Sequence, residues 1–275
     1  MDNSAVESQV IVVTSGKGGV GKTTTVANVA TALARNNYRV VVMDLDIGLK
    51  KLDLILGLEN RVIYDIIQVV EGECTLKQAL VKDKRFPNLF MLPAAQTRNK
   101  DDLRPDQVIS ICGQLQEDFD YIFIDCPAGI EQGFRNAIAA ANKAIVVTNP
   151  EVSAVRDADR IIGMLESSNF KNIQLVVNRL RSDMVKSGNM LSIDDLLEHL
   201  CIELLGVVPE DKNVVISTNN GEPIILNDKS SAALAFNNIA RRLTGENVAF
   251  LDLTESDSFW AKVKNLGRNF LPNKQ

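Results

Sequence analysis

Short apolar runs alternate with longer amphipathic segments along most of the chain. The runs are continuous and rich in β-branched residues, which is typical of strands buried on both faces of a parallel sheet. They occupy residues 10–13, 40–43, 121–124, 144–147, 175–177 and 205–208. Helical patterns span residues 23–35, 105–116, 152–167, 192–200 and 230–243. This alternation predicts one α/β domain over residues 1–250, with a mostly parallel sheet and helices on both of its faces.

Polar residues follow the predicted strands at the points where the strands end. Asp44 and Asp46 follow the second apolar run, Asp125 follows the third, Asn178 the fifth and Pro209 the last. Ligands of open parallel sheets collect beyond the carboxyl ends of the strands. We therefore expect a single nucleotide site at this edge of the sheet.

The first strand is followed by the pattern G-x-x-x-x-G-K-[ST], at residues 16–23. Between a strand and a helix, this pattern predicts a phosphate-binding loop and thus a Rossmann-like P-loop NTPase domain. Backbone N–H groups and the helix N-terminus would hold the phosphates. Lys22 would reach the β- and γ-phosphates, and the Thr23 hydroxyl would coordinate Mg²⁺. The candidate nucleotide-binding residues of the loop are Gly16, Lys17, Gly18, Gly19, Val20, Gly21, Lys22, Thr23 and Thr24.

Two carboxylates are candidates for the chemistry beside the γ-phosphate. Asp125 ends a strand of four apolar residues, as a Walker B aspartate does, and we expect it to hold Mg²⁺ through water. Of the pair after the second strand, Asp46 is the better candidate to orient the attacking water, because it begins the segment 46–49. The single histidine, His199, lies in a predicted helix away from these motifs. Hydrolysis would then depend on positioning and electrostatics, and would be slow without a partner.

Composition narrows the class of protein. Of the 275 residues, 45% are hydrophobic and 24% charged, an ordinary globular balance, and the net charge of -5 argues against nonspecific nucleic-acid binding. No apolar run approaches the roughly 20 residues that span a bilayer. The four cysteines are far apart and form no Cys-x-x-Cys pair, so we expect reduced thiols in a cytosolic compartment.

Lys17 directly follows the first glycine of the loop, so the loop carries two lysines. In this respect the segment 16–24 resembles the deviant Walker A motif of the MinD/ParA ATPases. The resemblance implies that ATP is the nucleotide and that Lys17 is a signature lysine, which reaches the phosphates bound by the partner in an ATP-sandwich homodimer. The catalytic residues would be Lys17, Lys22, Asp46 and Asp125. Asn178 and Pro209 would contribute to the adenine pocket.

The resemblance covers about residues 10–240. Outside the phosphate loop it is carried by the segments 46–49, 52–53, 92–94, 125–129, 148–160, 207–211 and 221–223. These segments are similar to the branch of the family that selects the cell-division site, and they differ in the DNA-partitioning branch. One departure is Lys51, where the family usually has Asn, so no contact is assigned to that side chain.

The last twenty residues have a different character. At 100° per residue, Phe259, Val263, Leu266 and Phe270 share one face of a helix, and Trp260 and Leu271 extend it. From residue 259 onward there are four basic residues and no acidic ones, whereas the rest of the chain carries 26 basic and 35 acidic residues. We expect residues 256–275 to form an amphipathic helix that lies on an anionic membrane surface, although a helix docked on the domain remains an alternative.

The resemblance implies a switch that positions the division septum. ATP would drive dimerisation and membrane docking, and hydrolysis would release the protein into the cytoplasm. The expected partners are a second copy, the division inhibitor MinC, the activator MinE or an equivalent, and the inner membrane, with a plastid envelope as the alternative location; no nucleic acid is expected. Two other functions stay open: a ParA-type DNA or cargo partitioning ATPase, and a metabolic ligase or kinase that acts as a monomer.

Overall fold

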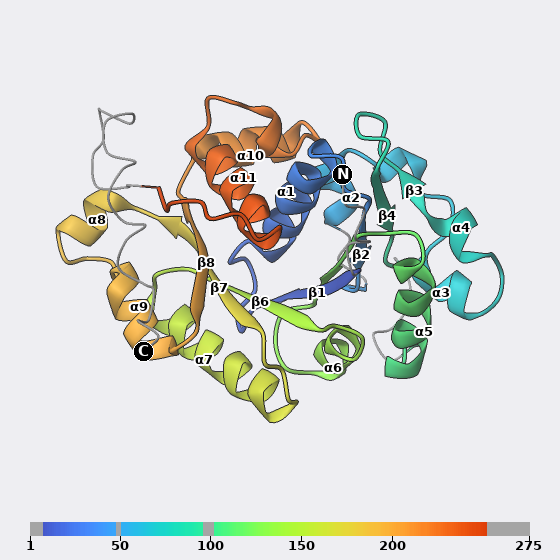
Figure 1. Cartoon of the computed structure of the whole chain (residues 1–275), viewed down its shortest axis with the longest axis horizontal. Coiled ribbons are helices and arrows are strands. Elements are labelled where there is room, and N and C mark those ends of the chain that lie inside the picture. Colours follow the sequence, from blue (N-terminus) through green and yellow to red (C-terminus); the bar gives the residue numbers. More distant parts are fainter. Residues whose placement is uncertain (1–7, 48–50, 96–101, 252–275) are drawn as a thin grey trace, which may run out of the picture.

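The computed structural model describes residues 8–47, 51–95 and 102–251. These form an eight-stranded sheet in the order β3-β4-β2-β5-β1-β6-β7-β8, in which every neighbouring pair is parallel except β3 and β4 (Figure 1). The predicted α/β class with a mostly parallel sheet is confirmed. The strands are β1 (Gln9–Thr14), β2 (Val40–Asp44), β3 (Val81–Lys82), β4 (Leu89–Leu92), β5 (Tyr121–Asp125), β6 (Lys143–Thr148), β7 (Ile173–Leu180) and β8 (Glu203–Pro209).

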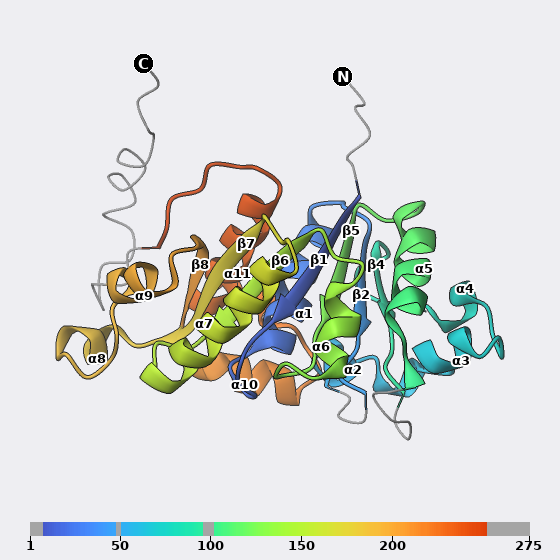
Figure 2. The ribbon, with the colours of Figure 1, turned by 90° about the horizontal axis from the view of Figure 1, so that it is seen from below.

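Helices cover both faces of the sheet (Figures 1 and 2). One face is covered by α1 (Lys22–Arg35), α2 (Leu52–Leu56), α10 (Lys212–Asn219) and α11 (Ser231–Leu243). On the other face and around it lie α3 (Ile66–Val70), α4 (Leu76–Ala79), α5 (Pro105–Gln116), α6 (Gln132–Ile138), α7 (Val152–Ser167), α8 (Ser182–Lys186) and α9 (Ile193–Leu200). None of the helices in the described ranges is long and apolar enough to cross a bilayer.

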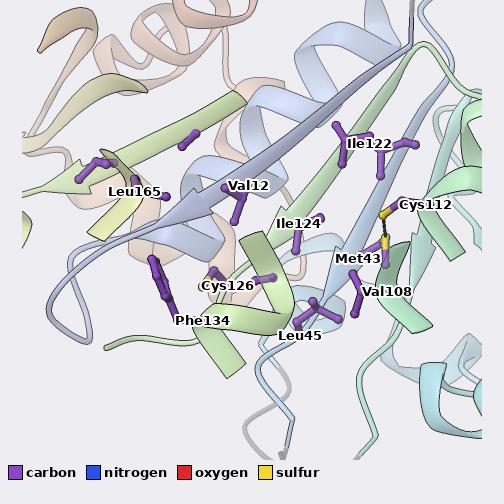
Figure 3. Packing of buried hydrophobic residues seen from close by; sticks show 14 of the residues in the cluster. Val12, Met43, Leu45, Val108, Cys112, Ile122, Ile124, Cys126, Phe134 and Leu165 are labelled. Carbon is purple, nitrogen blue, oxygen red and sulfur yellow. Dashed lines mark hydrogen bonds between the residues drawn. The ribbon is translucent and has the colours of Figure 1, made fainter. Parts of the chain in front are cut away.

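Each interior strand supplies two separate hydrophobic clusters, because successive side chains point to opposite faces of a sheet. In β1, Val10 and Val12 belong to the cluster under α5 to α7, whereas Ile11 and Val13 belong to the cluster under α1 and α11. Figure 3 shows part of the first cluster, in which side chains of the sheet pack against those of the surrounding helices. Burial on both faces is the reason that these strands read as continuous apolar runs.

All six predicted strands are present, as β1, β2, β5, β6, β7 and β8, and the five predicted helices are α1, α5, α7, α9 and α11. Missing from the predictions were β3, β4 and the helices α2, α3, α4, α6, α8 and α10, which have four to eight residues each. The predicted C-terminal helix and its candidate membrane residues lie outside the described residues: Phe259, Trp260, Val263, Leu266, Phe270 and Leu271.

The strand order decides where the site forms. β1 lies between β5 and β6, and β5 also pairs with β2, so the carboxyl ends of these strands meet at one edge. Val13 is the register partner of Asp125, and Asp125 is the register partner of Asp44. Segments that are about 80 and 110 residues apart in the sequence are thereby brought side by side.

Candidate functional site

The loop between β1 and α1 has the backbone shape of an anion-binding nest. Gly19 and Gly21 have φ angles of 80° and 103°, a conformation that favours glycine. Gly21 is also the N-cap of α1, which begins at Lys22. Backbone N–H groups and the positive end of the helix dipole therefore face the same volume, which suits a phosphate group.

Neighbouring elements hold this loop in place. A β-carbon on Gly16 would collide with the backbone of Asp157 in α7, so glycine is required there for close approach. The Asn178 side chain donates from Nδ2 to the Val20 carbonyl oxygen at 2.8 Å. On the opposite side, the Gly129 amide donates to the Ser15 carbonyl oxygen at 3.4 Å. The phosphate loop is thus fastened to α7, β7 and the segment after β5.

Lys22 points into the protein rather than into solvent. Its residue is 8% exposed, and Nζ donates to Ser15 Oγ at 2.9 Å. Burial lowers the pKa of Lys22, while the negative charge of Asp125 opposes that change. The amine therefore lies beside the loop and the carboxylates, where an anionic phosphate would offset the cost of its burial.

Asp125 is buried at the end of β5. Burial is the main reason that its pKa is raised to about 7, whereas a hydrogen bond from the Thr23 hydroxyl lowers it. Among the described residues, no group hydrogen-bonds to Asp125 Oδ1, although this atom is buried. A buried acceptor without a partner is costly unless a cation or an ordered water satisfies it.

Asp44 also belongs to this site, although the sequence favoured Asp46 as the residue that orients water. It ends β2 directly opposite Asp125 and is 3% exposed. Burial and the negative charge of Asp125 raise the pKa of Asp44 well above its usual range. Asp44 Oδ1 accepts a hydrogen bond from the Asp46 amide at 2.9 Å, so Asp44 fixes the backbone at the residue expected to orient water.

Asp46 itself is half-buried beside the phosphate loop. Its negative charge acts on both Lys22 and Asp125, which places all three groups in one electrostatic neighbourhood. Lys51 is exposed at the start of α2 and acts on the same two groups. The structure therefore brings together three of the predicted site residues, Lys22, Asp46 and Asp125, and places the charge of Lys51, to which the sequence assigned no contact, close enough to act on two of them.

Lys17 faces outward, unlike Lys22. Its side chain is 45% exposed, and Nζ lies 3.4 Å from Glu151 Oε2 and 3.4 Å from Ser153 Oγ. Glu151 is itself 53% exposed, so this ion pair is solvated and weak. The contact links the phosphate loop to the start of α7, over 134 residues of sequence. A lysine held this loosely is free to take a stronger anionic partner.

The two residues expected at the adenine pocket lie at the same edge of the sheet. Asn178 is 6% exposed, and its amide nitrogen is already bonded to the phosphate loop. Pro209 is half-buried at the end of β8 and pairs in register with Leu180 of β7. The structure therefore places Asn178 as a support of the loop, a role that its position after a strand did not reveal.

A cavity of about 700 Å³ opens beside this edge. It is bounded by the start of α7, the end of β7 and the connection from α8 to α9. Val152, which is 58% exposed, and Met190 give it apolar walls, and Arg179 and Glu210 give it charge. Its mixed lining is typical of a surface that binds a ligand or a short protein segment.

The residues fit a nucleotide with a bound divalent cation. The glycine cradle and Lys22 suit phosphate groups, and the orphaned oxygen of Asp125 beside the Thr23 hydroxyl suits a hard cation. The pKa values of Asp44 and Asp125 are both raised by burial and by a neighbouring carboxylate, and such a cation would stabilise the charged form of each.

Comparisons with known proteins agree with this reading of the site. Residues 11–224 match the CobQ/CobB/MinD/ParA nucleotide binding domain. The chain is 57% identical over 246 residues to the septum site-determining protein MinD of Synechocystis sp., covering 89% of this chain and 92% of that protein. Among solved structures it resembles the MinC:MinD cell division protein complex of Aquifex aeolicus, with a TM-score of 0.83, 48% identity and coverage of 88% and 98%.

A second structural neighbour is the septum site-determining protein MinD of Pyrococcus horikoshii complexed with Mg-ADP. The TM-score is 0.78 at 30% identity, and the match covers 86% of this chain and 96% of that one. The phosphate loop, the carboxylates beside it and the strand order all lie inside the matched domain. The chain therefore belongs to the CobQ/CobB/MinD/ParA nucleotide-binding family, in the branch formed by the septum site-determining MinD ATPases.

Proposed function

We propose that this protein is an ATP-driven switch that takes part in positioning the division septum. In its ATP form it is a homodimer that docks on an anionic membrane surface, and hydrolysis returns it to the cytoplasm, or to the stroma if its host is a plastid. The observation that carries the proposal is the pair of lysines in one phosphate loop, with Lys22 buried toward the carboxylates and Lys17 exposed at the rim.

The chemistry follows from the positions of the side chains. Lys22 and the loop amides bind the phosphates, and Thr23 and Asp125 hold Mg²⁺, which supplies positive charge at the transferred phosphate. Asp46, fixed through its amide by Asp44, orients the attacking water. The only histidine in the sequence, His199, lies in α9 and away from the phosphate loop, so no imidazole serves as a base and hydrolysis is slow until a partner completes the site.

Lys17 is the residue that couples hydrolysis to dimerisation. Its contact with Glu151 is solvent-exposed and contributes at most about 1 kcal/mol. A phosphate bound by a second copy is a stronger anion, so Lys17 leaves Glu151 and reaches across the interface. There it adds positive charge at the transition state, as an arginine finger does.

Partners bind at the start of α7, where the cavity and the exposed Val152 lie. The relative from Aquifex aeolicus is described as a MinC:MinD complex, which supports MinC as one partner. The second expected partner is an activator such as MinE. Membrane docking belongs to residues 256–275, because two weak amphipathic helices on one dimer bind together with far higher affinity than one.

Lys17→Ala tests the switch. We expect the variant to bind ATP, because Lys22 remains, but to stay monomeric and to hydrolyse ATP at no more than one-tenth of the native stimulated rate. Light scattering with ATP and with ADP measures the mass, and phosphate release measures turnover. Lys171→Ala, which removes an exposed lysine before β7, is the matched control.

Three results would contradict the proposal. Fast turnover by monomeric Lys17→Ala protein would point to an enzyme acting on a small substrate. Vesicle recruitment that survives truncation before Phe259 would refute the membrane role of the tail. Binding of DNA in place of vesicles would favour the partitioning alternative.

A further inference from the structure

The chain that follows α11 is folded back onto the domain. Gly245, with a φ of 88°, ends the helix, and its amide donates to the Arg242 carbonyl oxygen at 3.0 Å. The Glu246 amide then returns to the Arg241 carbonyl oxygen at 3.1 Å. After this turn the segment runs past β8, the edge strand of the sheet, up to Leu251 (Figures 1 and 2).

One side chain binds this segment and the edge strand at once. Arg242 Nε donates to the Val248 carbonyl oxygen at 2.9 Å, and Nη2 donates to that of Ala249 at 2.8 Å. Nη1 donates to the carbonyl oxygen of Leu205 in β8 at 3.0 Å. The guanidinium also lies 4.1 Å from the centre of the Phe250 ring. The planar fork of arginine is what allows three carbonyl groups to be held together.

The carbonyl that Arg242 binds on β8 has a special position. The register between β7 and β8 shifts between Leu204 and Gly206, so Leu205 is the extra residue of a β-bulge. Its carbonyl oxygen is therefore available for a partner outside the sheet. Gly206 keeps the approach open, since a β-carbon there would collide with Ile239 of α11.

Within residues 8–47, 51–95 and 102–251, no carboxylate forms an ion pair with Arg242. Its guanidinium is partly buried, and burial lowers its pKa to about 10. The neighbouring Arg241 behaves differently, because it forms an exposed ion pair with Glu246 at 2.8 Å. Thus Arg242 hydrogen-bonds to the backbone of residues 248 and 249, whereas Arg241 pairs with one surface carboxylate.

We propose that Arg242 is a positioning residue for the C-terminal tail: it fastens residues 246–251 to the edge strand, so that the tail begins at one fixed point of the domain. This inference rests on the proposed function, in which residues 256–275 bind membrane. Leu251 packs against the cluster under α1 and α11, so the anchored part ends there.

The contacts of Arg242 shorten the tether, by which we mean the part of the chain between the last fastened residue and Phe259. With the segment fastened, the seven residues 252–258 separate the domain from Phe259, the first apolar residue of the tail. If Arg242 is lost, the tether begins after α11 and comprises the 15 residues 244–258. Effective concentration falls roughly as the −3/2 power of tether length, so doubling the tether weakens two-tailed binding by about threefold.

The test uses the full chain and vesicles of phosphatidylglycerol and phosphatidylcholine, in a lipid titration with Mg-ATP and with Mg-ADP. We expect Arg242→Ala and Arg242→Lys to need about threefold more lipid for half-recruitment with ATP. Arg241→Ala makes the same charge change as Arg242→Ala and should bind as the native protein does. Hydrogen exchange of the amides of residues 246–251 shows whether the segment is released.

A second variant keeps every contact of Arg242. Insertion of eight Gly/Ser residues after Leu251 gives a 15-residue tether on an intact domain, and we expect the same threefold loss. If this insertion binds vesicles as tightly as the native chain, or if Arg242→Ala releases the segment without changing the titration, the proposal is wrong. Failure of the native chain itself to bind vesicles with ATP would instead overturn the membrane function, and this inference with it.

Discussion

Asp125→Asn is expected to stabilise the nucleotide-free protein at alkaline pH, although it removes a residue of the site. The pKa of the Asp125 carboxyl rises from 3.8 to about 7 on folding, chiefly through burial. Each tenfold change in proton affinity corresponds to about 1.4 kcal/mol, so the buried charge costs the folded state up to about 4 kcal/mol at pH 8. Asparagine has the same shape and no charge, and it also relieves the repulsion with Asp44.

The pH dependence gives the sign of the effect. Between pH 4 and pH 7 the folded protein keeps a proton that the unfolded chain has lost, so native stability falls as the pH rises through this window. Urea unfolding at pH 5 and pH 8 measures it. We expect Asp125→Asn to be more stable than the native protein by about 1.5 kcal/mol at pH 5, and by up to about 4 kcal/mol at pH 8.

A matched control is available on the protein surface. Asp159→Asn makes the same chemical change at an exposed position of α7 and should alter stability by less than about 0.5 kcal/mol at either pH. The reasoning is refuted if Asp125→Asn is no more stable than the native protein at pH 8, or if its advantage is the same at pH 5. Either result would mean that Asp125 is charged and well satisfied in the folded protein.

Two further substitutions test the packing around the site. Gly16→Ala places a methyl group against the backbone of Asp157 and should lower the melting temperature of the nucleotide-free protein by several degrees. The control is Gly18→Ala, where the nearest atom is the Ala128 β-carbon at 4.0 Å, and it should change the melting temperature by less than about 2 °C. Equal melting temperatures of the two variants would contradict the close approach of Gly16 to Asp157. In the native protein the fully buried Asp83 carboxylate lies 3.0 Å from Arg85 Nη2, and Arg85→Ala removes this cation. Urea unfolding should then show a free energy of unfolding that is lower by about 2–4 kcal/mol. A decrease of less than about 1 kcal/mol would mean that backbone amides alone satisfy Asp83.

The central strands were predictable because a strand that is buried on both faces has a continuous run of apolar residues in the sequence. β4 (Leu89–Leu92) is buried too, but its four residues include no β-branched side chain, and prolines stand at positions 87 and 93. β3 has only two residues. Strands this short, and helices of four or five residues, contain too few positions to show a period.

The phosphate loop was predictable from local sequence, whereas the environment of its neighbours was not. Asp44 is placed by strand register opposite Asp125, and no spacing within its own segment shows that pairing. The contact of Lys17 with Glu151 joins two distant loops in the same way. Asn178 has a side-chain role that depends on how closely β7 approaches Val20.

The position of β1 between β5 and β6 has a consequence for the way in which the protein is made. Both neighbours of this strand, whose four central residues are apolar, are encoded more than 100 residues later, whereas β2 and β4 can pair as soon as they emerge. At about 5–20 residues per second, the ribosome needs roughly 5–20 s to supply β5. Throughout that interval β1 and the phosphate loop lack both of their neighbouring strands, so the site cannot form before β5, which carries Asp125, has been made.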